Sequence, residues 1–205
     1  APLRETLAAL ILLEAGIAGY DLLIDPMCGS GSFSIEAASI LSGTLPNAVR
    51  AFPFMNWPSF KEKNYLYLKK KLLEKQRPES LEKIKIITSD IEPEAVKLAE
   101  SNIPEIFREA IAPEAADFFE LTPELLHGKK ALIVLNPPYG KRIKETDIHT
   151  FYRNIGLKLK NDFNNCGYAI IAPGVEAEQS LALDYGRKIP FKNGGIRAAV
   201  LFRDA

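Results

Sequence analysis

The sequence has few of the features that mark secreted, membrane-spanning or fibrous proteins. Its 205 residues include only two cysteines, Cys28 and Cys166, which are too few for a disulfide framework and lie too far apart for a zinc-binding spacing. No uninterrupted apolar run approaches the ~20 residues that span a bilayer, and the start of the chain has no signal-peptide pattern. The 13 glycines and 14 prolines are an ordinary number, which excludes collagen-like and low-complexity chains. We therefore expect a cytoplasmic protein without membrane contact.

The chain also lacks net charge, but its charges are unevenly distributed. It has 26 basic and 26 acidic residues, and 47% of its residues are apolar, as in an average globular domain. Residues 61–77 contain seven basic and two acidic side chains, residues 90–124 two basic and ten acidic, and residues 141–160 six basic and two acidic. Two basic regions around an acidic one are compatible with a nucleic-acid partner.

Alternating strand and helix patterns predict an α/β fold with a mainly parallel sheet. The predicted strands are residues 21–24, 84–87, 131–135, 168–171 and 198–202, and the predicted helices are residues 2–15, 33–41, 61–76, 93–103 and 148–159. The length fits a single domain over residues 1–205. Residues 43–76 form an insertion in it: an aromatic loop, which we expect to fold back on the body, is followed by a basic helix.

The first predicted strand ends in a turn of small residues, Asp25-Pro26-Met27-Cys28-Gly29-Ser30-Gly31. Such a turn lets a ligand approach the backbone closely and leaves amide N–H groups free at the start of the next helix. Ser34 replaces the third glycine of a dinucleotide-binding fingerprint, and the turn lacks the lysine of a phosphate-binding P-loop. The turn therefore fits a nucleoside ligand; the alternative is an ordinary strand–helix connection.

Two further acidic residues are candidates for contacting such a ligand. Asp90 ends the second predicted strand, where a carboxylate can accept hydrogen bonds from both hydroxyls of a ribose. It lies further from Gly31 than the ~20 residues of a plain βαβ unit, and the insertion accounts for the excess. The alternative is a helix-capping aspartate. Asp117 either ends a third strand, where it could accept an adenine amino group, or is a surface residue.

The motif Asn136-Pro137-Pro138-Tyr139 directly follows the apolar strand at 131–135. The prolines fix a rigid, extended path that holds the Asn136 side chain and the Pro137 carbonyl at the strand tip. Both groups are neutral acceptors, so they can take the two N–H groups of an exocyclic nucleobase amine and free its conjugated lone pair. Tyr139 can stack on the base. A bare turn is the alternative, which the two other ligand-like strand ends disfavour.

Together these residues resemble the class I S-adenosylmethionine-dependent methyltransferases that modify exocyclic amines of nucleobases. The segments Ala1 to Leu7 and Arg50 to Phe52, with Trp57 and with Asn193-Gly194, extend the resemblance to the THUMP-associated RNA guanine-N2 methyltransferases. The bacterial enzymes of large-subunit ribosomal RNA are the most similar. The resemblance implies a Rossmann-like sheet of seven mostly parallel strands with an antiparallel last strand and helices on both faces. It also implies a catalytic fragment that lacks an N-terminal THUMP domain.

The resemblance assigns roles to individual residues. S-adenosylmethionine is the implied cofactor, S-adenosylhomocysteine is its product, and no metal is expected. Thr6 would line the cofactor pocket, Asp90 would bind the ribose, and Ile91 and Asp117 would contact the adenine. The turn residues assigned to the cofactor are Asp25, Pro26, Cys28, Gly29, Ser30 and Gly31. The residues assigned to the target base are Asn136, Pro137, Pro138 and Tyr139.

Other substrates remain compatible with this chemistry. RNA is the expected partner, with ribosomal RNA favoured and tRNA as the alternative. Enzymes that methylate adenine N6 in DNA or glutamine in protein use the same motif, and a non-catalytic RNA-binding module is a further alternative. The basic residues Lys141, Arg142 and Lys144 next to the motif fit a polyanionic substrate under any nucleic-acid reading. The sequence leaves the oligomeric state open.

Overall fold

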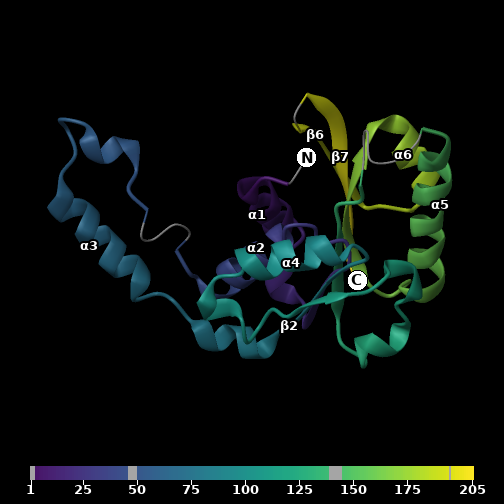
Figure 1. The fold of residues 1–205 in the computed structure, drawn as a ribbon, viewed down its shortest axis with the longest axis horizontal. Coiled ribbons are helices and arrows are strands. Elements are labelled where there is room, and N and C mark those ends of the chain that lie inside the picture. Colours follow the sequence, from purple (N-terminus) through teal and green to yellow (C-terminus); the bar gives the residue numbers. More distant parts are fainter. Residues whose placement is uncertain (1–2, 46–49, 139–144, 194) are drawn as a thin grey trace.

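A seven-stranded sheet runs through the protein in the order β3-β2-β1-β4-β5-β7-β6 (Figure 1). The computed structural model describes residues 3–45, 50–138, 145–193 and 195–205. The strands are β1 (Leu22–Asp25), β2 (Lys85–Asp90), β3 (Pro113–Ala115), β4 (Ala131–Leu135), β5 (Gly167–Pro173), β6 (Arg187–Asn193) and β7 (Ile196–Arg203). Pairing is parallel from β3 to β5, and β7 runs antiparallel to both β5 and β6. The expected seven-stranded sheet with an antiparallel last strand is confirmed.

Helices cover both faces of this sheet. The helices of the described ranges are α1 (Glu5–Glu14), α2 (Ser32–Ser42), α3 (Glu62–Leu73), α4 (Pro93–Asn102), α5 (Glu145–Asp162) and α6 (Gly174–Leu181), of which α3 does not cover the sheet. One apolar cluster joins α1 and α2 to the sheet through residues such as Leu23 and Leu132, and a second joins α5 and α6 to it through Ile24 and Ile133. Because neighbouring residues of β1 and β4 alternate between two covered faces, these strands have continuous apolar sequences.

The sheet has a topological switch point between β1 and β4. The chain continues from β1 to β2 on one side, whereas β4 pairs with β1 on the other. Ligands of open α/β sheets bind in the crevice that forms at such a point, beyond the carboxyl ends of the strands. The residues at or directly after these three ends are Asp25, Asp90 and Asn136. The fold therefore brings the three predicted groups of site residues together at the carboxyl ends of the strands.

Residues 50–77 form an arm that projects from the body (Figure 1). The expectation that the aromatic loop folds back on the body was wrong. Its rings pack on one another and on α3 instead: the centroid of Phe54 lies 5.8 Å from that of Phe60 and 6.0 Å from that of Tyr65. The loop thus covers part of its apolar surface within the arm, where Phe54 and Phe60 are half-buried. At the base, the Arg77 amide donates to the Ser42 carbonyl at 2.7 Å, so the two ends of the insertion meet.

All five predicted strands and all five predicted helices are present; β4 has the predicted ends, and the ends of the others are shifted. The sequence patterns did not predict β6 and α6, and they indicated a third strand before Asp117 only as one of two alternatives. Strand β3 has only three residues, and β6 contains Pro190 and three basic side chains, which an edge strand tolerates because one side of it needs no ladder. No helix within the described ranges is long and apolar enough to cross a membrane.

Candidate active site

The turn after β1 is shaped by two glycines with left-handed backbone angles. Gly29 has a φ of 55° and Gly31 a φ of 79°. A Cβ on Gly31 would lie 3.3 Å from the Cβ of Ala99 in α4, whereas one on Gly29 would meet nothing within 4 Å. The turn therefore needs glycine for its backbone conformation at both positions, and at Gly31 also for close packing against α4.

Asp90 fixes this turn from the neighbouring strand. Its carboxylate accepts hydrogen bonds from the Gly29 amide at 2.9 Å and from the Glu92 amide at 3.0 Å. The first residue of α4 is Pro93, preceded by Glu92 as the N-cap, so Asp90 is not the helix-capping residue of the alternative interpretation. The side chain is half-buried, and a carboxylate has about four acceptor positions. Asp90 thus keeps acceptor capacity for a ligand while it holds the turn.

Asp25 lies beneath the turn and is completely buried. One carboxylate oxygen accepts a hydrogen bond from the Ser34 hydroxyl at 2.8 Å, and Ser34 lies 2.7 Å from the Thr88 hydroxyl. Burial raises the pKa of Asp25 to about 7; the Ser34 hydrogen bonds oppose this shift and the charge of Asp90 adds to it. Direct contact of this side chain with a cofactor stays a prediction.

The sequence reading did not recognise Ser34 and Thr88 as parts of the site. Ser34 was noted only as a departure from the glycine fingerprint. A buried carboxylate needs donors, because an unsatisfied polar group in the interior costs about 1–3 kcal/mol. A hydroxyl residue on the first turn of a helix after a strand-ending aspartate is the signal that could have found Ser34. Nothing local marks Thr88, which reaches this pair only through the pairing of β1 with β2.

The remaining turn residues have structural partners. Cys28 is buried, its amide donates to the Ser89 carbonyl at 2.9 Å, and burial raises the pKa of its thiol. A thiol of this kind is not an activated nucleophile, since the thiolate is the reactive form. Pro26 is buried next to Asp25. The Ser30 carbonyl accepts a hydrogen bond from Asn102 at 3.1 Å, which ties the turn to α4.

The segment directly before α1 lies beside the turn. The Ser32 hydroxyl donates to the Leu3 carbonyl at 3.2 Å, so the segment before α1 meets the start of α2. Thr6 is exposed on the first turn of α1. Its assignment to the cofactor pocket agrees with this position and stays a prediction.

Ile91 and Asp117 follow the two outer strands of this edge. Ile91 comes directly after Asp90 and is 60% exposed, so an apolar side chain lies open beside the carboxylate. Asp117 lies two residues after β3, which pairs in parallel with β2. Its carboxylate accepts a hydrogen bond from the Phe119 amide at 2.9 Å. The third strand is present but ends at Ala115, two residues before Asp117, and the contact of Asp117 with adenine stays a prediction.

Asn136 lies at the tip of β4 with an unsatisfied acceptor. Its side-chain oxygen is buried and has no hydrogen-bond partner among the described residues. Pro137 is buried and Pro138 is half-buried. Tyr139 and the basic residues Lys141 to Lys144 lie outside the described residues. Within the described part of the chain, the arrangement therefore presents a neutral acceptor without a donor, at the same edge of the sheet as Asp90 and the glycine turn.

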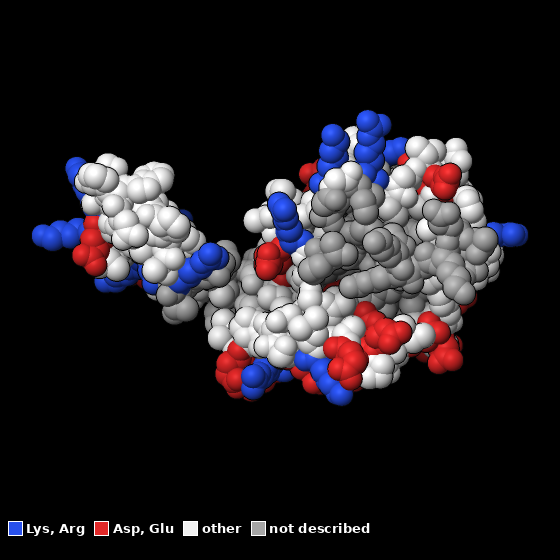
Figure 2. Space-filling model, turned by 45° about the horizontal axis from the view of Figure 1, so that its top comes forward, with Lys and Arg blue, Asp and Glu red and all other residues white. Residues whose placement is uncertain are grey.

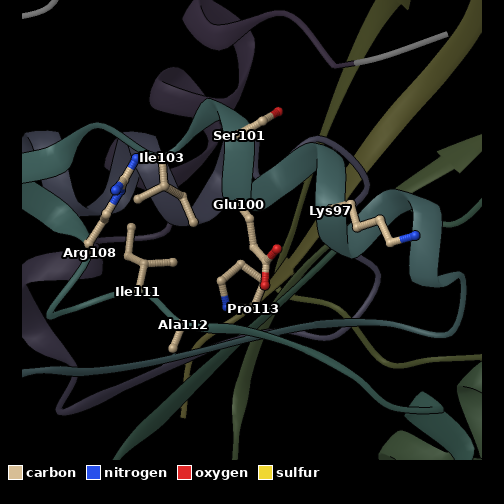
Figure 3. Close-up of a pocket in the computed structure, with 8 residues that line it drawn as sticks. All are labelled: Lys97, Glu100, Ser101, Ile103, Arg108, Ile111, Ala112 and Pro113. Carbon is tan, nitrogen blue, oxygen red and sulfur yellow. The ribbon is translucent and has the colours of Figure 1, made fainter.

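A hollow of about 530 Å³ lies away from this edge, between α4 and the segment that enters β3 (Figure 3). None of the predicted site residues lines it. Its lining residues are Lys97, Glu100, Ser101, Ile103, Arg108, Ile111, Ala112 and Pro113. Among the described residues no three His, Cys, Asp or Glu side chains are grouped as they would be around a metal ion.

Comparison with known proteins agrees with the geometry at the strand ends. Residues 1–198 match the sequence profile of the RMKL-like methyltransferase domain, which is nearly the whole chain. The chain belongs to this methyltransferase family. The family places the domain among the methyltransferases, as the motif at the tip of β4 predicted.

Curated relatives of this methyltransferase domain are named ribosomal RNA large subunit methyltransferase K/L. The protein from Acinetobacter baumannii strain AYE is 32% identical over 213 residues, which cover 98% of this chain and 29% of the relative. That from Shewanella frigidimarina is 31% identical over 207 residues, covering 97% of this chain and 28% of the relative. The chain thus spans less than a third of the length of these relatives.

Solved structures share the fold of the domain. A possible methylase from Clostridium difficile 630 has a TM-score of 0.83 at 28% identity and covers all of this chain and 53% of its own. The putative methyltransferase SMU.472, complexed with SAH, has a TM-score of 0.85 at 23% identity, over 98% of this chain and 52% of that one.

Proposed function

We propose that this domain transfers a methyl group from S-adenosylmethionine to the exocyclic N2 amine of a guanine in large-subunit ribosomal RNA. The observation that carries the proposal is the buried side-chain oxygen of Asn136, which has no hydrogen-bond partner among the described residues. An isolated acceptor of this kind costs about 1–3 kcal/mol unless a ligand supplies the donor. An amine N–H is such a donor, and the names of the K/L relatives support ribosomal RNA as its source.

The residues of the neighbouring strand ends fit the cofactor. Asp90 retains acceptor positions for two ribose hydroxyls beside its bonds to the Gly29 and Glu92 amides. The exposed apolar side chain of Ile91 offers a surface for a purine ring, and the glycine turn lets a ligand approach the backbone. When bound, S-adenosylmethionine supplies an electrophilic methyl carbon on a sulfonium, which is already a good leaving group.

The work of the protein is then to position and desolvate the amine. The Asn136 oxygen and the Pro137 carbonyl accept its two N–H groups, which directs the nitrogen lone pair away from the ring system. The N–C bond forms as the C–S bond breaks, and the proton that the amine loses passes to solvent, since a carboxamide is not a base. Alignment of two reacting groups can supply about 7–11 kcal/mol of a barrier, so no residue with a shifted pKa is required.

A transfer assay tests this proposal. The protein is incubated with methyl-labelled S-adenosylmethionine and separate pools of unmodified ribosomal RNA, tRNA, DNA and protein, and labelled products are digested to nucleosides or amino acids. We expect label in N2-methylguanosine from large-subunit ribosomal RNA. Label in tRNA alone would contradict the proposed RNA, and label in N6-methyladenosine or in methylglutamine would contradict the proposed acceptor. Cofactor binding without label in any pool would favour a non-catalytic binding module.

A further inference from the structure

The arm formed by residues 50–77 contributes none of the residues assigned to the cofactor or to the target base at the carboxyl ends of the strands. Within the described residues, α3 makes no extensive contact with another helix or strand, and Figure 1 shows it standing away from the body. An isolated helix of fewer than about 12–15 residues is marginal in water, and α3 has 12 residues. The arm is thus a protrusion that the core does not require, and its surface indicates what it contacts.

The surface of the arm is basic. Residues 61–77 carry seven basic and two acidic side chains, in a chain whose net charge is zero. Figure 2 shows blue side chains projecting from the arm with few red ones, whereas red side chains gather along the lower border of the body. On α3, Lys63, Lys70 and Lys71 are exposed and fall on one broad helical face, since Lys70 and Lys71 follow Lys63 by about two helical turns. This face is complementary to a polyanion.

Exposed aromatic rings accompany these charges. Tyr67 is 56% exposed on the same face as the three lysines, and the Lys71 ammonium lies 4.7 Å from the centre of its ring. Trp57, in the aromatic loop of the arm, is 62% exposed. Aromatic rings inside a positively charged surface are typical of proteins that bind single-stranded nucleic acid, where each stacked base contributes about 1–3 kcal/mol.

The arm also extends toward the side of the sheet on which the carboxyl ends of the strands lie. The hairpin of β6 and β7 extends beyond the carboxyl ends of the strands, because β7 begins opposite the end of β5. In Figure 1 the outer end of the arm stands at the level of this hairpin. An RNA that lies on the arm can therefore continue toward Asn136.

We propose that the arm is an RNA-binding element that captures the substrate backbone through the lysine face of α3 and stacks unpaired bases on Trp57 and Tyr67. This inference rests on the proposed RNA substrate and adds the surface that holds it. The exposed leucines of α3, among them Leu66 and Leu68, are the feature that a protein partner would use instead. Protein interfaces are depleted of lysine at their centre, so the lysine face favours RNA.

The single tryptophan of the chain makes the arm directly observable. The probe is an RNA hairpin with a single-stranded loop, and the readouts are Trp57 fluorescence and the affinity as a function of salt. We expect the hairpin to quench Trp57, and inorganic polyphosphate, which has charge but no bases, to bind with little quenching. Quenching by neither probe would overturn the stacking role of the arm.

The charge is tested with a triple variant, Lys63→Ala, Lys70→Ala and Lys71→Ala. Alanine preserves the helix, which circular dichroism confirms. Each phosphate contact contributes about 0.7 to 0.9 to the slope of log K against log salt, so the variant is expected to lower the slope by about 2–3 and the affinity about 10- to 100-fold. The matched control replaces three exposed lysines near the amino ends of the strands, Lys83, Lys129 and Lys160. It should leave the slope of log K against log salt within about one unit of that of the unmodified protein.

Three results would overturn or separate the proposals. Equal effects of the arm variant and the control would show general attraction and overturn the inference. Self-association that Leu66→Gln abolishes, with RNA affinity unchanged in the lysine variant, would overturn it in favour of a protein contact. RNA binding that depends on the arm, without methyl transfer to any pool, would leave the inference standing and defeat the proposed function.

Discussion

At the residue scale, Asn136 and Asp90 divide the proposed chemistry between them. The buried oxygen of Asn136 has no hydrogen-bond donor in the part of the chain that the structure describes, whereas the Asp90 carboxylate accepts hydrogen bonds from two backbone amides and keeps further acceptor positions. Asn136 is placed to orient the amine that accepts the methyl group, and Asp90 is placed to bind the cofactor. Substitutions at the two positions should therefore affect different measured constants.

Asn136→Ala is expected to lower kcat about 10²- to 10³-fold, the range seen when one hydrogen bond to a transition state is lost. The dissociation constant of S-adenosylmethionine should stay within about twofold, since Asn136 is assigned to the base and not to the cofactor. Single-turnover kinetics and calorimetric titration measure the two quantities. Asn136→Asp keeps an acceptor oxygen and should retain more activity than alanine. Equal losses of turnover and cofactor affinity would contradict the assigned role.

Asp90→Ala is expected to weaken S-adenosylmethionine binding at least about 10-fold, because a hydrogen bond to a charged group contributes about 1.5–3 kcal/mol. Calorimetric titration measures the affinity. The variant also removes the acceptor of the Gly29 and Glu92 amides, so its thermal unfolding is the necessary control. Unchanged affinity in a folded variant would exclude Asp90 from the cofactor site.

Asp25 makes the stability of the domain depend on pH. Its folded-state pKa is raised to about 7 by burial, above the usual value near 4, so the folded state holds a proton that the unfolded state has lost between these values. The free energy of unfolding should therefore fall as pH rises through this window, by at most about 1.4 kcal/mol per pH unit, and level off above pH 7. In the Asp25→Asn variant, the free energy of unfolding should fall less over this pH window. Urea unfolding at several pH values measures this free energy for both proteins. Parallel pH profiles of the two proteins would contradict this cause.

At the element scale, the approach of α4 to the turn after β1 determines the shape of the cofactor edge. Asn102 at the end of α4 donates to the Ser30 carbonyl, and Ala99 approaches Gly31. The turn is therefore fixed by α4, and the hydrogen bond between Asp25 and Ser34 joins the residues at its two ends. Gly29 and Gly31, separated by Ser30, allow the two requirements of this turn, backbone conformation and close packing, to be measured separately.

Gly31→Ala is expected to destabilise the domain more than Gly29→Ala. Both positions have positive φ, where a side chain costs about 1–2 kcal/mol, but only at Gly31 would the new Cβ also press on Ala99. Urea unfolding measures both free energies. Equal losses at the two positions would show that α4 yields to the added methyl group.

At the scale of the whole molecule, a body that carries the chemistry is joined to an arm that the core does not require. The arm leaves and re-enters the body at one point, where Arg77 bonds to Ser42. Its aromatic rings cover one another, so its removal exposes little of the body.

Replacing residues 45–76 with a short glycine–serine linker should therefore leave a folded domain. We expect the melting temperature to change by no more than a few degrees and the affinity for S-adenosylmethionine to persist, with methyl transfer to RNA reduced. Calorimetry, titration and the transfer assay measure these three properties. A variant that fails to fold would show that the arm is part of the core.

Much of the site could be predicted from the sequence alone. The apolar run of β4 and the motif after it, the small residues after β1, and Asp90 at the end of β2 are local patterns, because burial and turn geometry impose them on neighbouring residues. These local patterns were sufficient to predict the α/β class, the edge of the sheet at which a ligand is expected to bind and the class of reaction.

Only the tertiary structure decided what depends on distant residues. The pairing of β3 and β6 at the two edges of the sheet leaves little periodic signal, since edge strands tolerate proline and charge. The burial of Asp25 under Ser34 and Thr88 requires β1 and β2 to lie side by side. The aromatic loop packs on α3 and not on the body, because Phe54 and Phe60 contact each other and Tyr65, which no local pattern indicates. Composition indicated that aromatic side chains would pack together, and only the tertiary structure determined on which element.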